Sequence, residues 1–399
     1  MKEQIGKKTV SMTESAAEVR REQRRLYAET IPYLLHWYEY NRRILPWRED
    51  PTPYHVWVSE IMLQQTRVEA VRGYYDRFLA SLPNIRALAE AEEEHLLKLW
   101  EGLGYYNRVR NMQKAARVLV EQYDGVMPAA YEKIRSLPGI GDYTAGAISS
   151  IAFGLPYPAV DGNVLRVMSR IAENEEDIAK EATKQKLKED LINVFCEQSI
   201  PYGDYNQSLM ELGATVCLPN GKPLCDTCPV MHLCKAFHAG RETDLPVKSG
   251  KKERRIENRI VFVVFYEGKI LLHKREGQGL LAGLWEFPNM LQNEGMVSEL
   301  PFVLKKRKKA KHIFSHVEWH MEGLWMELQC GESREAEAMA EWSRWFTKQG
   351  VPDTAAEQEF VLVTPARMRE SYPIPSAFEA FLKEIEKDEQ EAGEAPAET

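Results

Sequence analysis

Two acidic side chains occupy positions where their surroundings could give them different protonation states. Glu60 lies in the apolar run VWVSEIML at positions 56–63. Apolar surroundings raise the pKa of a carboxyl group, so that it can donate a proton near neutrality. Asp161 precedes a periodic run that starts at Val164, where a helix cap is expected to keep it ionised. One protonated and one ionised carboxyl group is the pair that cleaves a glycosidic bond. A surface position for Glu60 is the alternative.

A glycine-rich segment, LPGIGDYTAGA at positions 137–147, comes before Asp161. Gly139 and Gly141 predict a sharp turn between two helices. The first backbone N–H groups of the second helix have no intrahelical partner and can bind a phosphate oxygen. An ordinary glycine-capped turn is the alternative, and the aspartate that follows favours a grip on nucleic acid.

Four cysteines form a C-x7-C-x2-C-x5-C run, namely Cys217, Cys225, Cys228 and Cys234. Such clustering predicts a metal site. Zinc is the competing metal, but a single C-x2-C pair favours one [4Fe-4S] cluster held by four thiolates. The remaining cysteines, Cys196 and Cys330, are expected to be buried thiols.

Changes in composition divide the 399 residues into several segments. An all-α domain is expected at 29–237, with the cysteine loop at 217–234, followed by a basic linker at 238–258 and an α+β domain at 259–383. Residues 1–28 are predicted to be a flexible, frayed helical extension, and residues 384–399 an acidic disordered tail. That tail carries −6 of the net charge of −8, so the remainder is compatible with DNA binding. We expect a cytoplasmic protein, since neither a secretory signal nor a membrane-spanning run is evident.

The α+β segment contains strand-like runs at 260–265 and 269–273, and then GLLAGLWEFPNM, which resembles the opening of the Nudix fold. The dense carboxylates of a catalytic Nudix helix do not follow it, so we do not expect a metal-dependent pyrophosphatase. A basic run at 305–311 leads into Phe314, Ser315 and His316. This run is either a solvated face or part of a surface where the three residues contact a base.

Taken together, these motifs resemble the MutY-type adenine DNA glycosylases of the helix-hairpin-helix superfamily, over residues 30 to 382. The related endonuclease III enzymes carry a nucleophilic lysine where this chain has Tyr143. An amine is needed for the Schiff base of a lyase, so the resemblance implies a monofunctional hydrolase. The family usually has C-x6-C as its first cysteine spacing. We expect the extra residue here to bulge outward without moving the thiols.

The resemblance implies a DNA repair enzyme that flips adenine out of a duplex where it pairs with 8-oxoguanine or guanine. Glu60 would then protonate the base and Asp161 would stabilise the cationic sugar, with Tyr143 and Asn163 ordering the site. The other implied contacts are Arg43 and Trp47 in the pocket, Arg48 and Gln207 at the purine edge, Gln65, Thr66, Leu103 and Tyr105 at the opposing lesion, and Phe314, Ser315 and His316 in a lesion-reading loop.

The expected protein is a monomer associated with DNA in the nucleoid. Three alternatives stay open at this point. One is a non-catalytic iron-sulfur protein that binds DNA or senses redox state, and another is a bifunctional endonuclease III-like glycosylase-lyase. The third is a nucleotide-pool hydrolase that depends on the C-terminal domain.

Overall fold

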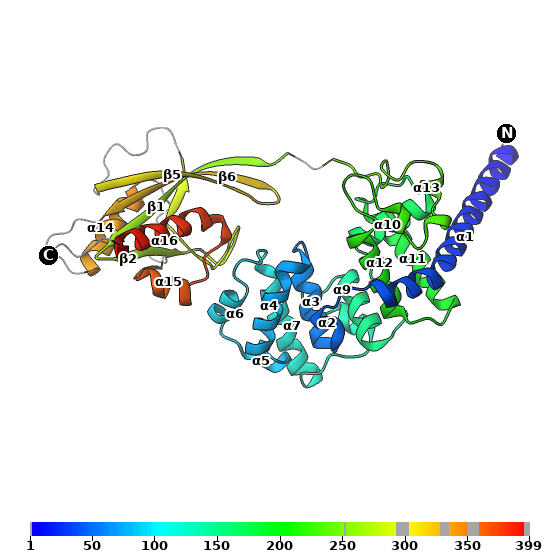
Figure 1. Ribbon diagram of the computed structural model, residues 1–399, viewed down its shortest axis with the longest axis horizontal. Helices are drawn as coiled ribbons and strands as arrows, with labels where there is room; N and C mark the ends of the chain where they lie inside the picture. The colour runs from blue at the N-terminus through cyan, green and yellow to red at the C-terminus, as the bar shows by residue number, and fades with distance from the viewer. Residues whose placement is uncertain (1, 251–252, 293–302, 328–334, 349–358, 395–399) are drawn as a thin grey trace. The chain divides into compact units, whose positions relative to one another are not determined.

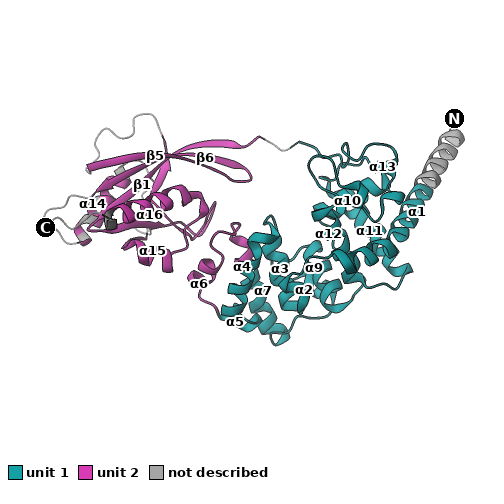
Figure 2. Ribbon diagram, viewed as in Figure 1, with its two compact units in different colours: residues 1–90, 110–250 teal, residues 91–109, 251–399 magenta. Residues whose placement is uncertain are grey.

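The computed structural model describes residues 2–250, 253–292, 303–327, 335–348 and 359–394. Two compact units divide the chain (Figures 1 and 2). Unit 1 contains residues 1–90 and 110–250, and unit 2 contains residues 91–109 and 251–399. Unit 2 therefore includes residues 91–109 together with the C-terminal part of the chain. Among the described residues, no helix is both long enough and apolar enough to cross a membrane.

Unit 1 is built from helices, as predicted. They are α1 (Lys2–Asn41), α2 (Pro46–Glu49), α3 (Pro53–Leu63), α4 (Val68–Ser81), α5 (Ile85–Glu90), α7 (Asn107–Tyr123), α8 (Tyr131–Arg135), α9 (Asp142–Ala147) with a π-helical turn (Ile148–Ala152), α10 (Gly162–Ala172), α11 (Glu181–Glu197), α12 (Tyr202–Thr215) and α13 (Lys235–His238).

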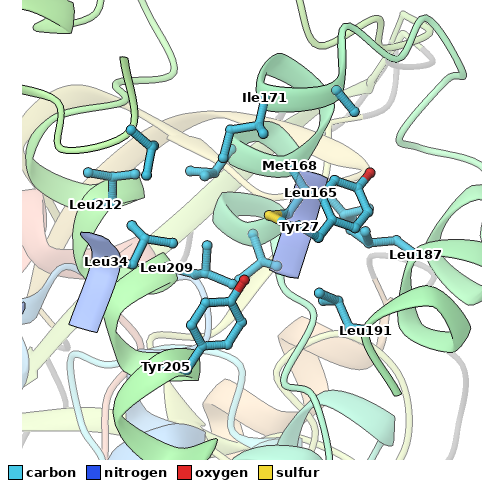
Figure 3. Packing of buried hydrophobic residues seen from close by; sticks show 14 of the residues in the cluster. Tyr27, Leu34, Leu165, Met168, Ile171, Leu187, Leu191, Tyr205, Leu209 and Leu212 are labelled. Carbon is cyan, nitrogen blue, oxygen red and sulfur yellow. The ribbon is translucent and has the colours of Figure 1, made fainter. Parts of the chain in front are cut away.

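The core around α10 fixes the position of Asp161, which caps this helix. Leu165, Met168 and Ile171 recur at helical spacing and face the buried cluster. Figure 3 shows them packed against side chains from α1, α11 and α12. Because α10 is buried along its length, its first turn is held rigidly.

The N-terminal segment differs from the prediction of a flexible extension. Helix α1 is continuous from Lys2 to Asn41, and Tyr27 is a buried member of the same core. Closer to the N-terminus of α1, the Arg20 guanidinium lies 2.7 Å from the carboxylate of Asp190, which is buried on α11. These contacts could not be predicted from the polar composition, because the residues that make them are far apart in the sequence.

In the part of unit 2 that the structure describes, seven strands form a sheet in the order β3-β2-β1-β6-β5, in which β4 pairs with β1 and β7 with β2. Strands β1 and β6 are parallel, and the other pairs are antiparallel. The strands are β1 (Arg255–Tyr266), β2 (Lys269–Lys274), β3 (Trp285–Glu286), β4 (Asn289–Leu291), β5 (Val303–Ile313), β6 (Val317–Glu327) and β7 (Phe360–Val363). The helices are α6 (Glu93–Leu99), α14 (Glu335–Lys348), α15 (Pro365–Ser371) and α16 (Glu379–Glu394).

Alternation along β1 gives this sheet two buried faces. Val261 and Val263 pack with Phe381 of α16, whereas Phe262 packs against Trp342 of α14. Helices therefore cover both faces of the sheet. The predicted class, a helical domain followed by an α+β domain, is confirmed.

The acidic C-terminal segment is a second departure from the prediction. Helix α16 continues to Glu394, and its Glu384 and Asp388 carboxylates accept hydrogen bonds from Lys306 of β5, with Glu384 also bonded to Lys308. The opposite charges of the two segments neutralise each other, which a local composition argument cannot detect. Residues 395–399 lie outside the described residues, as does Cys330. Cys196 is exposed, so the prediction of a buried thiol there was wrong.

Candidate active site

A cavity of about 980 Å³ opens within unit 1 and is lined by both Glu60 and Asp161. The two carboxyl groups proposed from the sequence therefore share one space. The other predicted residues that line this cavity are Arg43, Trp47, Arg48, Gln65, Thr66, Gly139, Gly141, Tyr143, Asn163 and Gln207.

Glu60 reaches the cavity from helix α3. Thr52 caps this helix by accepting a hydrogen bond from the His55 N–H, and the following turns are buried on nearly all sides. Glu60 is 6 % exposed, and its Oε2 accepts a hydrogen bond of 2.5 Å from the Tyr143 hydroxyl. Burial raises the pKa of Glu60 to about 7, which the Tyr143 hydrogen bond opposes and the nearby Asp161 charge reinforces. The predicted proton donor thus titrates near neutrality.

Asp161 is the N-cap of α10, as predicted. One carboxylate oxygen accepts a hydrogen bond of 2.7 Å from the Val164 N–H, and the other accepts one of 2.8 Å from the Asn163 amide. Burial nevertheless raises the pKa of Asp161, while these hydrogen bonds favour its charged form. The cap position alone predicts an ionised Asp161, and the burial of this carboxyl group opposes its ionisation.

Arg166 holds Asn163 in place. Arg166 was not among the residues predicted from the sequence. The guanidinium donates to the Asn163 side-chain oxygen at 2.9 Å, to the Gly213 carbonyl at 2.8 Å and to the Cys217 carbonyl at 2.9 Å. The available sequence signal was an arginine three residues after Asn163, inside an otherwise apolar helical run.

Glu211 was also missed, although it lies at the wall of the cavity. It is fully buried on α12 and accepts hydrogen bonds from Arg43 at 2.7 and 3.1 Å and from Arg48 at 2.8 Å. Burial opposes its ionisation, but the bonds and charges of the two arginines hold the pKa of Glu211 below its usual value. The two predicted pocket arginines are therefore bound to a common carboxylate.

The hairpin forms as predicted, with α8, a glycine turn and α9 in succession. Gly139 has a φ of +75°, and a Cβ there would lie 2.6 Å from the Cβ of Asn111. Gly141 caps α9 with open space where its Cβ would be, so a ligand can approach the backbone closely. These features fit a site where backbone N–H groups bind a phosphate.

The four cysteines of the loop line a second, smaller cavity in unit 1, of about 30 Å³. The Arg170 guanidinium donates to the Cys217 sulfur at 3.2 Å and so brings a positive charge to the four cysteines. Residues 219–222 are exposed, and the Leu224 N–H bonds to the Val216 carbonyl across the base of this loop. This exposed stretch lies within the first cysteine spacing, which is one residue longer than the family's usual spacing.

The four cysteines of the loop are candidate ligands of a metal group. Among the residues that the structure describes, no three His, Cys, Asp or Glu side chains form a group that could hold a metal ion. The four cysteines line one cavity. Four thiols are the set of ligands that an iron–sulfur cluster held by thiolates requires.

Five predicted contact residues lie in unit 2, whereas the cavity is lined by residues of unit 1. Leu103 is buried and Tyr105 is half exposed with a φ of +49°, a left-handed conformation uncommon for a large side chain. Phe314, Ser315 and His316 form the turn between β5 and β6. Phe314 packs edge-on against Trp319, whereas Ser315 and His316 are exposed.

Sequence comparisons agree with this architecture. Residues 58–191 match the family described as HhH-GPD superfamily base excision DNA repair protein, and residues 260–384 match the NUDIX domain. The adenine DNA glycosylase of Mus musculus is 36 % identical over 381 residues, covering 78 % of this chain and 73 % of the mouse protein. The human adenine DNA glycosylase is 35 % identical, covering 79 % and 70 %. A thermostable thymine-DNA glycosylase structure matches 55 % of this chain and 98 % of its own, with 27 % identity and a TM-score of 0.48.

The helical unit, its hairpin and the paired carboxyl groups define a base excision DNA glycosylase of the helix-hairpin-helix class. The Nudix-like domain and the similarity to the mouse and human adenine DNA glycosylases narrow the class of protein further. The chain belongs to the adenine DNA glycosylase family. The family predicted from the sequence is thus confirmed.

Proposed function

We propose that this protein removes adenine that is paired with 8-oxoguanine or guanine in duplex DNA, by hydrolysis of the bond between base and sugar. The observation that carries the proposal is that Glu60 and Asp161 line one cavity with different hydrogen-bond partners. Family membership supports adenine as the excised base. The choice of opposing base is part of the proposal.

Hydrogen bonding divides the protonation states between the two carboxyl groups. Asp161 accepts from a backbone N–H and from the Asn163 amide, both of which favour its ionised form. Glu60 accepts a single hydrogen bond from Tyr143 in buried surroundings. When the pair holds one proton, we therefore assign it to Glu60.

The reaction then follows from these positions. The Glu60 proton moves to a ring nitrogen of the flipped adenine, and the glycosidic bond breaks with its electron pair leaving on the base. The sugar becomes an oxocarbenium-like cation, which the Asp161 carboxylate stabilises. Water adds to the sugar carbon, and its proton returns to the Glu60 carboxylate. The products are free adenine and an abasic site.

The residues of the cavity support hydrolysis without a lyase step. A Schiff base needs an unprotonated amine at the sugar, and Tyr143 supplies a phenol instead. Two lysines line the cavity, and both are engaged: Lys184 with Glu181 at 3.2 Å, and Lys188 with Asp142 at 3.1 Å. We therefore expect no strong strand cleavage.

We also assign a [4Fe-4S] cluster to Cys217, Cys225, Cys228 and Cys234. The four thiols around one cavity and the Arg170 hydrogen bond support this assignment. Such a cluster, when bound, holds its loop in shape, and the hydrolysis itself needs no electron. Iron analysis and visible absorption test the assignment, and stoichiometric zinc without iron would overturn it.

For recognition of the opposing base we propose the turn that contains Ser315 and His316. Their exposure, with Phe314 anchored against Trp319, supports a preformed loop that presents a hydroxyl and an imidazole. The basic strand beside it is less available, since Arg307 and Lys311 pair with Glu322 and Glu318 of β6. We expect the protein to act as a monomer on DNA in the cytoplasm.

The test uses labelled duplexes that carry adenine opposite 8-oxoguanine, guanine, cytosine or thymine. Treatment with alkali after incubation reveals abasic sites, and omission of alkali reveals lyase cleavage. We expect alkali-dependent cleavage at adenine, fastest opposite 8-oxoguanine. Equal cleavage opposite all four bases would contradict the proposed specificity, and cleavage without alkali would contradict the monofunctional mechanism.

A further inference from the structure

We propose that Glu211 is a positioning residue for the glycosylase reaction, because it binds Arg48 at the cavity wall and cancels the arginine charge that Glu60 would otherwise face. This inference rests on the proposed function, since it concerns the proton that Glu60 donates.

Glu211 joins two segments that are distant in the sequence. It lies on the face of α12 that also carries Gln207 and Met210, and all three side chains line the cavity. Its carboxylate holds Arg43 through the side chain at 2.7 Å and the backbone N–H at 3.2 Å. It also holds Arg48, at 2.8 Å. The segment that carries Trp47 into the cavity is thereby fixed between two bound arginines.

Arg48 has few other partners that could balance its charge. Its other side-chain hydrogen bond, at 3.1 Å, goes to the neutral backbone carbonyl of Arg43. The Arg48 side chain is 11 % exposed and that of Glu211 is fully buried, so water screens this pair poorly. Arg43 is more exposed and has Glu69 at 3.8 Å as a further acidic neighbour. Glu211 is therefore the buried counter-charge for Arg48.

The groups that act on Glu60 come from several elements. Tyr143 of α9 donates a hydrogen bond, Asp161 at the start of α10 is acidic, and Arg48 of α2 is cationic. Met210 of α12 contacts the Tyr143 hydroxyl and is neutral. Further out, the cavity lining carries the paired groups Asp142, Arg135 and Lys188, and Glu181 with Lys184. Burial raises the pKa of Glu60 most; among these groups, the Tyr143 hydrogen bond and the Arg48 charge lower it, and the Asp161 charge raises it.

Loss of the Glu211 charge would leave Arg48 uncompensated near Glu60. The stronger positive field would favour the ionised form of Glu60, which then loses its proton at a lower pH. A glycosylase that needs this proton loses activity as pH rises through the pKa of Glu60. The basic limb of its pH profile should therefore move to lower pH in Glu211→Gln.

The experiment measures single-turnover release of adenine from an 8-oxoguanine-containing duplex as a function of pH. In Glu211→Gln we expect the basic limb to move to lower pH by about one unit. At pH values above the pKa of Glu60, the rate should therefore be roughly tenfold lower than that of the wild type, relative to the plateau of each protein. In Arg48→Met the limb should move up. In the double variant it should return towards the wild-type position. An unmoved limb in Glu211→Gln, with a uniform loss of rate at all pH values, overturns the inference.

A matched control is Asp190→Asn, which removes another buried carboxylate paired with an arginine in unit 1, outside the cavity lining. It should lower thermal stability and leave the limb in place. If Glu211→Gln does not fold, Arg48→Met still decides the matter, because a limb that moves down or stays would contradict the charge argument. Absence of adenine release by the wild type would instead refute the proposed function.

Discussion

Replacement of Tyr143 by phenylalanine tests how the protein sets the acidity of its proton donor. The Tyr143 hydroxyl donates a 2.5 Å hydrogen bond to Glu60 and so lowers the pKa of that carboxyl group, which burial holds at about 7. A hydrogen bond to a charged group is worth about 1.5–3 kcal/mol. Since one pKa unit corresponds to about 1.4 kcal/mol, Tyr143→Phe should raise the pKa of Glu60 by about 1–2 units.

The sign of the expected change is opposite to that for Glu211→Gln. Glu60 would keep its proton to a higher pH, so the basic limb of the single-turnover profile should move upward in Tyr143→Phe. Tyr205→Phe is the matched control, since Tyr205 is buried on α12, bonds to Thr30 and does not line the cavity. A limb that stays in place or moves down in Tyr143→Phe would refute the assignment of Glu60 as the titrating acid.

Three further predictions concern the hairpin, the second unit and DNA affinity. Gly139→Ala should destabilise the protein by about 1–2 kcal/mol, measured by thermal denaturation, because of the positive φ and the close approach of Asn111. Glu286→Ala should destabilise unit 2 by about 3–5 kcal/mol in denaturant, since it leaves the partly buried Arg275 and His273 without their carboxylate. Duplex affinity measured by anisotropy should fall about 10³-fold between about 50 and 200 mM salt, and flat binding would contradict phosphate contacts.

The local motifs could be predicted from the sequence because each depends on neighbours in the chain. The apolar run around Glu60, the cap position of Asp161 and the glycines of the hairpin all have their causes within a few residues. Glu211 could not be found in this way, since it meets Arg43 across 168 residues. A lone glutamate on a helix gives no sign that two distant arginines will bind it.

The same limit explains the differences at the two ends of the chain. Polar composition predicted a flexible helical extension at the N-terminus and a disordered tail at the C-terminus, but Arg20 pairs with Asp190 and Lys306 pairs with Asp388. Charge complementarity between distant segments compensates for a scarcity of apolar residues there. Composition is a local property and therefore misjudged both.

The central claim is that a proton on Glu60 and a negative charge on Asp161 act together on one base–sugar bond. Single-turnover release of adenine by Glu60→Gln and Asp161→Asn, opposite 8-oxoguanine, tests it most directly, with matched thermal stability as the check on folding. We expect each variant to lose about 10²–10⁴-fold in rate while it still binds the duplex. A wild-type rate in either folded variant would contradict the mechanism.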